Sequence, residues 1–347
     1  MIKAHRHVFN PDLPIIKEGW KGNPITQKGR FLNHEHPFIP SFREIAKWKS
    51  KPNPDAGRKR SDKWRLQVDP IHNIKEIEDN TITWLGHASF LIKMNNVTIL
   101  TDPIISSPSA LMPRFSPFPI PKKAIKDIDV LLISHDHRDH VDARSLKRIF
   151  KQNPNASVYT GLGMTNLLKN WTVNNKITEA GWFQSLPELN GLQFTYLPCR
   201  HWGKRWLNDT NTRLWGSFMI TSKDWKVFYG SDSGYGSHYK EIQELYSYVD
   251  ISMIGIGAYK PEWFMHPSHT SPKDAYQIAK DLNSKGLFPM HYGTFDLSDE
   301  AISDPCENIQ KAANAEEGGP ALLLGHPGKP YPISSVSTLS TAKLRPL

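Results

Sequence analysis

The sequence contains few cysteines and no long apolar segment. Its 347 residues include only two cysteines, Cys199 and Cys306, which are too few for a disulfide framework, so we expect a protein of the reducing cytoplasm. No apolar run approaches the roughly 20 residues of a membrane-spanning helix. Residues 1–6 lack the continuous apolar stretch of a signal peptide. We therefore expect a soluble protein, with peripheral attachment to the inner membrane face as an alternative.

Acidic residues are scarce at the N-terminus. Residues 1–66 hold 15 Lys and Arg against 6 Asp and Glu, and this difference accounts for the whole net charge of +9. Residues 47–51 and 58–65 interleave cations with tryptophan. This pattern fits an anionic lipid surface or a phosphate backbone. A solvated extension that aids solubility explains it equally well.

Composition divides the chain into two parts. Residues 1–75 are rich in Pro, Gly and charge, with one weakly periodic stretch at 41–48 that predicts a short helix. We expect them to form an irregular basic extension that wraps a catalytic domain of residues 76–347. In that domain, short β-rich runs come first and then alternate with amphipathic segments, which predicts an α/β sandwich of two mixed β-sheets flanked by helices. The expected strands span 81–85, 89–94, 97–101, 129–134, 157–160, 192–197, 215–221, 227–230, 251–256 and 287–290, and the expected helices 142–151, 164–170, 239–248, 271–283 and 305–315.

A proline-rich apolar loop occupies residues 103–126. Five prolines between residues 107 and 121 exclude a helix or a central strand there. The Leu, Met, Phe and Ile side chains of this loop predict a groove for an acyl chain or a surface that dips into a bilayer. Packing against the N-terminal extension is the alternative.

The densest group of metal-binding side chains is His135-x-His137-x-Asp139-His140. It follows the apolar residues 130–133, and a loop that leaves a buried strand can turn such side chains inward. Imidazoles with one carboxylate suit Zn²⁺. We interpret this loop as the first half of a two-metal site, because one short loop cannot supply two coordination spheres.

Three isolated candidates complete the set, each after an apolar run. His201 follows residues 192–198, Asp232 follows 226–229, and His291 follows 287–290. Two divalent ions about 3.5–4 Å apart need a carboxylate between them to offset their repulsion. Such a pair activates water as a nucleophile near neutral pH.

With these residues in this order, HxHxDH followed by His, Asp and His, the chain resembles the metallo-β-lactamase superfamily. Within it, the chain is similar to N-acyl-phosphatidylethanolamine-hydrolysing phospholipase D and its bacterial relatives. The residues that carry this likeness are 83–90, 100–103, 201–205, 214–217, 257–265 and 291–295. Arg138 and Gly203 stand where that family leads us to expect Tyr and Cys, and these departures bear on the substrate rather than on the metals.

The resemblance implies an αββα sandwich that holds two Zn²⁺ ions. It places His135, His137 and His201 at one ion, Asp139, His140 and His291 at the other, and Asp232 as the bridge.

Several further residues are expected around the metals, and of these Asp102 and His87 are expected there because both follow β-rich runs. Asp139 is expected to be catalytic as well as a ligand. His269 is expected to donate a proton to the leaving group or to bind phosphate, with a cap on the following helix as the alternative. Asp102 is expected to orient a metal-binding histidine. The remaining candidates are His87 beside the ligands and Lys204, Arg205 and Tyr259 at the substrate.

The activity that the resemblance implies is phosphodiester hydrolysis of a phospholipid, giving phosphatidic acid and an N-acylethanolamine. A lactonase of sugar phosphates is one alternative, although its small polar substrate has no use for the apolar loop. A nuclease suits the basic extension, but the arm of such enzymes is missing, so we expect no nucleic-acid partner. A non-catalytic membrane-binding relative is disfavoured by the seven candidate ligands. A homodimer is left open.

Overall fold

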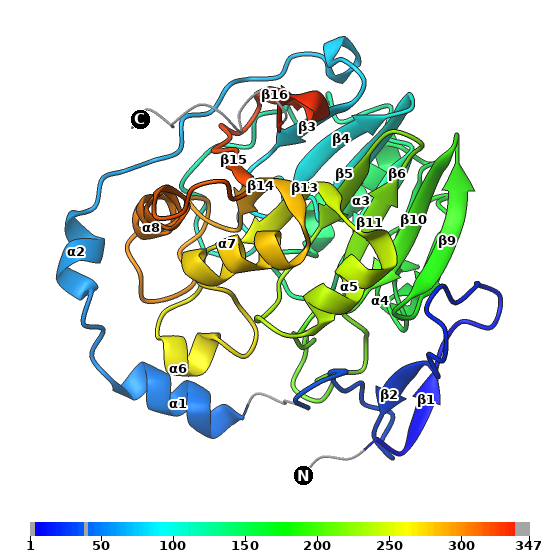
Figure 1. Ribbon diagram of the computed structural model, residues 1–347, viewed down its shortest axis with the longest axis horizontal. Coiled ribbons are helices and arrows are strands. Elements are labelled where there is room, and N and C mark those ends of the chain that lie inside the picture. Colours follow the sequence, from blue (N-terminus) through cyan, green and yellow to red (C-terminus); the bar gives the residue numbers. More distant parts are fainter. Residues whose placement is uncertain (1–3, 38–40, 111, 337–347) are drawn as a thin grey trace.

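Two β-sheets face one another at the centre of the molecule (Figure 1). The structure is a computed structural model and describes residues 4–37, 41–110 and 112–336. The strands are β1 (Arg6–Val8), β2 (Asn23–Ile25), β3 (Thr81–Trp84), β4 (Phe90–Met94), β5 (Val97–Thr101), β6 (Val130–Ile133), β7 (Ser157–Gly161), β8 (Ile177–Ala180), β9 (Gln184–Leu189), β10 (Leu192–Leu197), β11 (Ser217–Thr221), β12 (Lys226–Tyr229), β13 (Val249–Gly255), β14 (Ser284–Met290), β15 (Ala321–Leu322) and β16 (Pro330–Pro332). The helices are α1 (Phe42–Ser50), α2 (Ala56–Ser61), α3 (Ala143–Gln152), α4 (Thr165–Leu168), α5 (His238–Tyr246), α6 (Glu262–Met265), α7 (Pro272–Asp281) and α8 (Asp304–Asn314), with 3₁₀ turns at Ile74–Glu76 and Ile333–Ser335.

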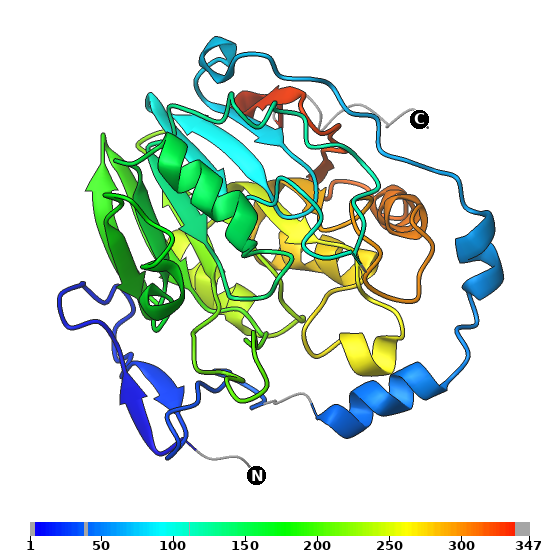
Figure 2. The same cartoon turned by 180° about the vertical axis from the view of Figure 1, so that it is seen from behind.

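The sheets are mixed and have seven strands each. One runs in the order β15-β14-β13-β12-β11-β10-β9, and the other in the order β16-β3-β4-β5-β6-β7-β8. Helices α5 and α7 lie over the outer face of the first sheet in Figure 1, and α3 covers the second sheet, as the view from behind in Figure 2 shows. The predicted αββα sandwich is confirmed.

Strand β6 illustrates why the sheets need cover on both faces. All four of its residues are buried. Val130 and Leu132 point into the core between the sheets, while Leu131 and Ile133 pack beneath α3. Successive side chains on a strand alternate between the two faces, so a continuous apolar run belongs to a strand that is buried on both sides.

The predicted helices are present, and so is the predicted start of α7. The Ser271 hydroxyl accepts a hydrogen bond from the Asp274 amide, the Asp274 carboxylate accepts one in return, and Pro272 stands in the first turn. The sequence did not reveal strands β8 and β9. Both mix polar and apolar residues on each face, and β9 contains Pro187, which an edge strand tolerates.

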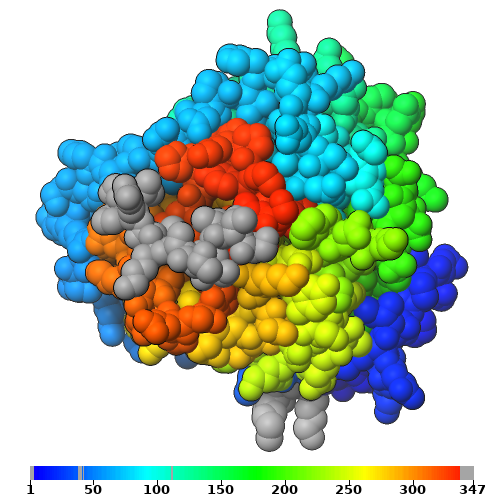
Figure 3. All heavy atoms as spheres, turned by 45° about the horizontal axis from the view of Figure 1, so that its top comes forward, coloured from blue at the N-terminus to red at the C-terminus, as the bar shows by residue number. Residues whose placement is uncertain are grey.

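The N-terminal residues lie along the outside of the sandwich. Strands β1 and β2 form a hairpin, and Lys17 and His34 after β1 and β2 both pair with Glu241 of α5. Residues 41–66, which we name the strap, contain α1 and α2. Figure 3 shows the light blue residues after α2 along one edge of the molecule, beside the orange and red C-terminal elements. The division of the chain at residues 75 and 76 stays a prediction.

Two cations of the strap pair with carboxylates of the domain. Arg58 pairs with Asp304 at 2.6 Å and with Glu307 at 2.8 Å, and Lys59 pairs with Asp296. The side chains of the strap tryptophans also face the domain: the Trp64 ring stacks on Tyr292 with centroids 6.4 Å apart. Part of the positive charge that the sequence offers to an anionic partner is therefore neutralised within the chain.

The proline-rich loop packs on the domain. Ile104, Ile120 and Ile125 are buried, and the Ile71 amide donates to the Pro119 carbonyl at 2.9 Å. Leu111 lies outside the described residues, as do residues 1–3 of the signal-peptide expectation. The loop thus packs in part against the N-terminal extension, and its contact with a lipid stays a prediction.

Cys199 and Cys306 are both free and buried. Among residues 4–37, 41–110 and 112–336, no helix has the length and apolar character that a bilayer crossing requires.

Candidate metal centre

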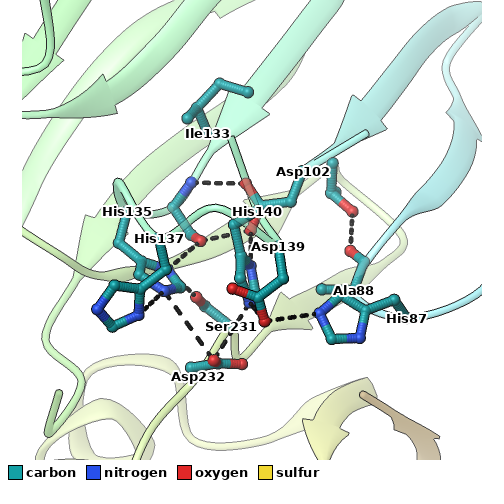
Figure 4. A network of polar contacts seen from close by, with 12 residues as sticks. His87, Ala88, Asp102, Ile133, His135, His137, Asp139, His140, Ser231 and Asp232 are labelled. Atoms are coloured by element: carbon teal, nitrogen blue, oxygen red, sulfur yellow. Dashed lines mark hydrogen bonds and ion pairs between the residues drawn. The ribbon is translucent and has the colours of Figure 1, made fainter. Parts of the chain in front are cut away.

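The candidate ligands meet where several strands end. The loop after β6 carries His135, His137, Asp139 and His140, and the segments after β10, β12 and β14 carry His201, Asp232 and His291. Figure 4 shows the side chains of the β6 loop gathered above Asp232. Because β5, β6 and β7, like β12, β13 and β14, run parallel, their carboxyl ends open toward the same region of the molecule.

One cluster consists of His135, His137, His201 and Asp232. The Nδ1 atom of His137 lies 3.0 Å from Nε2 of His135 and 3.0 Å from Nε2 of His201. The Asp232 Oδ2 atom is 4.0 Å from Nε2 of His135 and 3.9 Å from Nε2 of His201. Three imidazole nitrogens and one carboxylate oxygen thus face a common point.

The other cluster consists of His87, Asp139, His140 and His291. Asp232 reaches it too, since its Oδ2 lies 3.2 Å from Nε2 of His140 and its Oδ1 lies 3.1 Å from Nε2 of His291. Asp232 stands between the two clusters, where a bridging carboxylate belongs. His87 is within hydrogen-bonding distance of Asp139, with its Nε2 3.1 Å from Oδ2 (Figure 4).

Buried groups hold the ligands from behind. The Asp102 carboxylate lies 2.7 Å from Nδ1 of His140 and accepts hydrogen bonds from the Ser134 amide at 2.8 Å and the Tyr229 hydroxyl at 2.6 Å. The Ser268 carbonyl lies 2.9 Å from Nδ1 of His201. Such contacts fix the ring orientation and leave the opposite nitrogen free for a metal.

The backbone is strained at this site. His87, Ser231 and His291 have φ angles of 53°, 54° and 63°, which residues with a side chain rarely adopt. The His291 amide donates to the His87 carbonyl at 3.0 Å, and the His87 amide donates to the Thr294 hydroxyl at 2.8 Å. These bonds hold a conformation that costs free energy, as is common at functional sites.

Charge in the site favours a bound cation. Burial and the neighbouring imidazoles lower the pKa of His135 and His201 well below the usual range, so both rings are neutral near pH 7. Burial alone would raise the pKa of Asp232, but His140 and His291 outweigh it and hold the pKa well below its usual value. Burial alone would lower the pKa of His140 and His291, but Asp232 and Asp139 outweigh it and raise the pKa of His140 well above its usual value and that of His291 to about 9. These two rings would release a proton on binding a metal ion, whereas His135 and His201 are already neutral.

Nε2 of His137 and Nδ1 of His291 are buried without a hydrogen-bond partner among the described residues. Unpartnered buried polar atoms are rare, because each costs free energy. The donor set and these atoms fit divalent metal ions.

A groove of about 630 Å³ opens onto the clusters. His137, Asp139 and Asp232 lie at one end, and His269 and Lys204 also line it. The Nδ1 atom of His269 is 3.9 Å from Oδ2 of Asp232. The structure thus brings His269 and Lys204 to the place where a substrate would meet the metals.

Two predicted substrate residues are placed differently. Arg205 is buried and donates from Nη1 to the carbonyls of Asp136 and Val141, at 3.1 and 2.5 Å. It borders the groove, but its guanidinium holds the ends of the metal loop. The Tyr259 side chain accepts a hydrogen bond from Asn308 and lines a separate groove between α7 and α8.

Sequence reasoning missed other contributors. The Asn33 amide group donates to the His201 carbonyl at 2.9 Å and accepts from the His201 amide at 3.0 Å, so the N-terminal extension fixes one candidate ligand. Arg213 pairs with Asp136 of the metal loop at 2.6 Å. In the sequence, the only signal for the Arg213 contact is the carboxylate of Asp136, which lies between His135 and His137 and needs a cationic partner when it is buried.

A family model described as a β-lactamase superfamily domain matches residues 97–292, a span that includes all seven candidate ligands. The chain belongs to the metallo-β-lactamase superfamily. It is 31% identical over 267 residues to the N-acyl-phosphatidylethanolamine-hydrolysing phospholipase D 1 of Caenorhabditis elegans, covering 72% of this chain and 75% of that one.

One more relative and one solved structure are similar to the chain. The mitochondrial N-acyl-phosphatidylethanolamine-hydrolysing phospholipase D of Saccharomyces cerevisiae is 30% identical over 273 residues, which are 73% of this chain but 57% of that protein. A solved metallo hydrolase of the archaeon Ignicoccus hospitalis superimposes with a TM-score of 0.56 at 20% identity, over 72% of this chain and 97% of that one, and shares the fold. The predicted family resemblance is confirmed.

Proposed function

We propose that the protein is a dinuclear, zinc-dependent phosphodiesterase of the phospholipase D type. Its proposed substrate is N-acyl-phosphatidylethanolamine or a related phospholipid, the substrate named for two relatives. At the level that these relatives and the Ignicoccus protein share, the chain is a metal-dependent hydrolase. The observation that carries the finer proposal is the pair of ligand clusters around Asp232 at the end of an apolar groove.

The proposed ligands divide between two ions. His135, His137 and His201 would hold one, Asp139, His140 and His291 the other, and Asp232 both. Zinc is favoured because imidazole nitrogen dominates the donor set. Bound there, two divalent ions lower the pKa of water and offset the negative charge that develops on phosphate oxygens.

His269 is placed to hold the phosphate. Burial lowers the pKa of its imidazole to about 4, so the ring is neutral near pH 7. A neutral imidazole is a weak proton donor but still offers one N–H to an oxygen. Of the two roles expected for this residue, phosphate binding is therefore the one we assign, with the Lys204 ammonium as a further cation in the groove.

We also propose that the groove opens onto an anionic phospholipid surface. Trp206 and Leu207 at the mouth are 61% and 89% exposed, and Trp263 is 44% exposed. Lys47 lies 4.8 Å from the centroid of the Trp263 ring, and Arg138 lies 5.1 Å from that of Trp206. Exposed aromatic rings beside cations suit the headgroup region of a bilayer.

Vesicle sedimentation tests this surface. Binding to phosphatidylglycerol vesicles is expected to weaken with salt and with Trp206→Ser, and to persist with Phe9→Ser, which removes another exposed aromatic ring beyond the end of β1. Equal binding by all three proteins would refute the proposal. We further propose that the protein is located in the cytoplasm.

The activity is tested by mass spectrometry of products. Metal-loaded protein is incubated with N-acylated and ordinary phospholipids, a sugar lactone and a short RNA, with His291→Ala as the control. Phosphatidic acid that forms only with the intact site is the expected result. Turnover of the lactone or the RNA alone would leave the metal centre standing and overturn the lipid substrate.

A further inference from the structure

The strap supplies a wall of the groove. Ile45 and Trp48 of α1 line it together with Phe264 and Met265 of α6. The strap lies outside residues 97–292, the span that matches the family model. This wall is therefore made by a segment that lies far from the candidate metal ligands in the sequence.

Trp48 is firmly placed. Its indole N–H donates to Oδ2 of Asp299 at 3.0 Å, and its ring stacks on Phe264 with centroids 5.1 Å apart. The Asn53 side chain donates to the Asp299 carbonyl at 2.9 Å, so one residue of the domain secures the strap at two points. With its N–H satisfied, the indole presents an apolar surface to the groove.

Trp202, Trp206 and Leu207 also line the groove. Its lining further holds the cations Arg138, Lys204 and Arg205, with Arg138 5.1 Å from the centroid of the Trp206 ring. A groove that joins metal-binding and cationic groups to apolar side chains matches an amphiphile with a phosphate head and a hydrocarbon chain. A small polar ester would leave most of this apolar surface unused.

We propose that Trp48 determines specificity, by providing the surface against which the hydrocarbon chain of a phosphodiester lies while its phosphate is at the metal centre. This inference rests on the proposed phosphodiesterase function. It assigns the strap a role in choosing long-chain over short-chain substrates. Trp48 takes no part in the chemistry.

The test compares Trp48→Ala with Trp64→Ala. Both variants remove a tryptophan of the same strap, but Trp64 stacks on Tyr292 and does not line the groove. Phosphodiesters with one head group and hydrocarbon chains of increasing length serve as substrates. For the long chains, Trp48→Ala is expected to lower kcat/KM at least about tenfold, mainly by raising KM, because the wall contacts ground and transition states alike.

Short-chain substrates complete the design. Trp48→Ala should hydrolyse them as the parent protein does, and Trp64→Ala should keep the preference for long chains. An equal loss for short and long chains with Trp48→Ala would overturn the proposal, as would the same loss of preference in Trp64→Ala. Thermal unfolding of each variant reports how far the strap as a whole has been weakened.

Binding of dodecyl and butyl phosphate, measured by calorimetry, separates this inference from the proposed activity. The parent protein is expected to bind the dodecyl ester more tightly, and Trp48→Ala is expected to lose that advantage. If no phosphodiester is hydrolysed, the proposed function is wrong. The binding data still show whether Trp48 contacts the hydrocarbon chain. Equal affinity of the parent protein for both esters would overturn the inference.

Discussion

The metal centre and the strap wall border the same groove, but they are built in opposite ways. Buried hydrogen bonds hold the metal centre from within, as between Asp102 and His140. Ion pairs nearer the solvent help to hold the strap from outside, as between Arg58 and Glu307. Buried polar networks are costly to break, whereas exposed pairs contribute little. The metal centre is therefore rigid, whereas the residues of the strap wall can be substituted at small cost to the stability of the fold.

The largest effect is expected at the proposed bridge. Asp232→Asn removes the carboxylate that belongs to the first cluster and also lies next to His140 and His291 of the second. Metal content should fall from two ions per chain, and hydrolysis should fall by at least about 10²-fold, because charge stabilisation at the reacting phosphate is lost. Elemental analysis and initial rates measure both. Full metal content in this variant would show that Asp232 is no bridge.

Removing the support behind His140 should have the next largest effect. Asp102→Ala is expected to weaken metal affinity about 10–100-fold, as for other partners of metal-binding histidines. Asp250→Ala is the matched control, since Asp250 is equally buried but pairs with Lys285 at the far end of β13. Chelator competition measures the affinity. Similar losses in the two variants would mean that the effect is one of general stability.

The contact between α5 and the N-terminal residues should depend on pH. Burial alone would raise the pKa of Glu241, but His34 and Lys17 outweigh it and lower the pKa from 4.5 to about 2. The folded-state value lies below the unfolded one, so the stabilisation is complete above about pH 4.5 and is lost as pH falls toward 2. Glu241→Gln should lower the melting temperature at pH 7 and do so less at pH 3.5. A difference that grows with acidity would contradict this assignment.

The smallest effect is expected for the outer ion pairs of the strap. Arg58→Ala removes a half-exposed guanidinium, while Lys260 stays 3.6 Å from Asp304. The free energy of unfolding should fall by about 1 kcal/mol or less, and by less still in high salt. Urea unfolding at two salt concentrations measures it. A much larger loss of unfolding free energy would show that the strap is held as firmly as the metal centre.

The sequence located the seven candidate ligands because its information about them is local. Each candidate ligand follows an apolar strand, and strand ends that meet at one edge of a sandwich bring such residues together. The same logic located Asp102, one residue beyond β5. Asn33 was beyond reach, because its contact with His201 depends on how the N-terminal segment crosses the domain. The same holds for Trp48 and Asp299, which are 251 residues apart.

The sequence also did not show in which direction individual side chains point. Ala258 lines the metal groove, whereas its neighbour Tyr259 points into the groove between α7 and α8. No pattern in the short segment 257–259 distinguishes the two sides. Arg205 presents the same difficulty, because a cation in a loop is expected in solvent, yet this one is buried against the carbonyls of the metal loop.

In the proposed reaction, water attacks the phosphorus of a lipid phosphodiester at this metal centre. Hydrolysis of N-acyl-phosphatidylethanolamine in water enriched in oxygen-18, followed by mass spectrometry of both products, tests it most directly. The account predicts the heavy oxygen in the phosphate of phosphatidic acid and none in the N-acylethanolamine. Label in the alcohol product, or no release of either product by the metal-loaded protein, would contradict it.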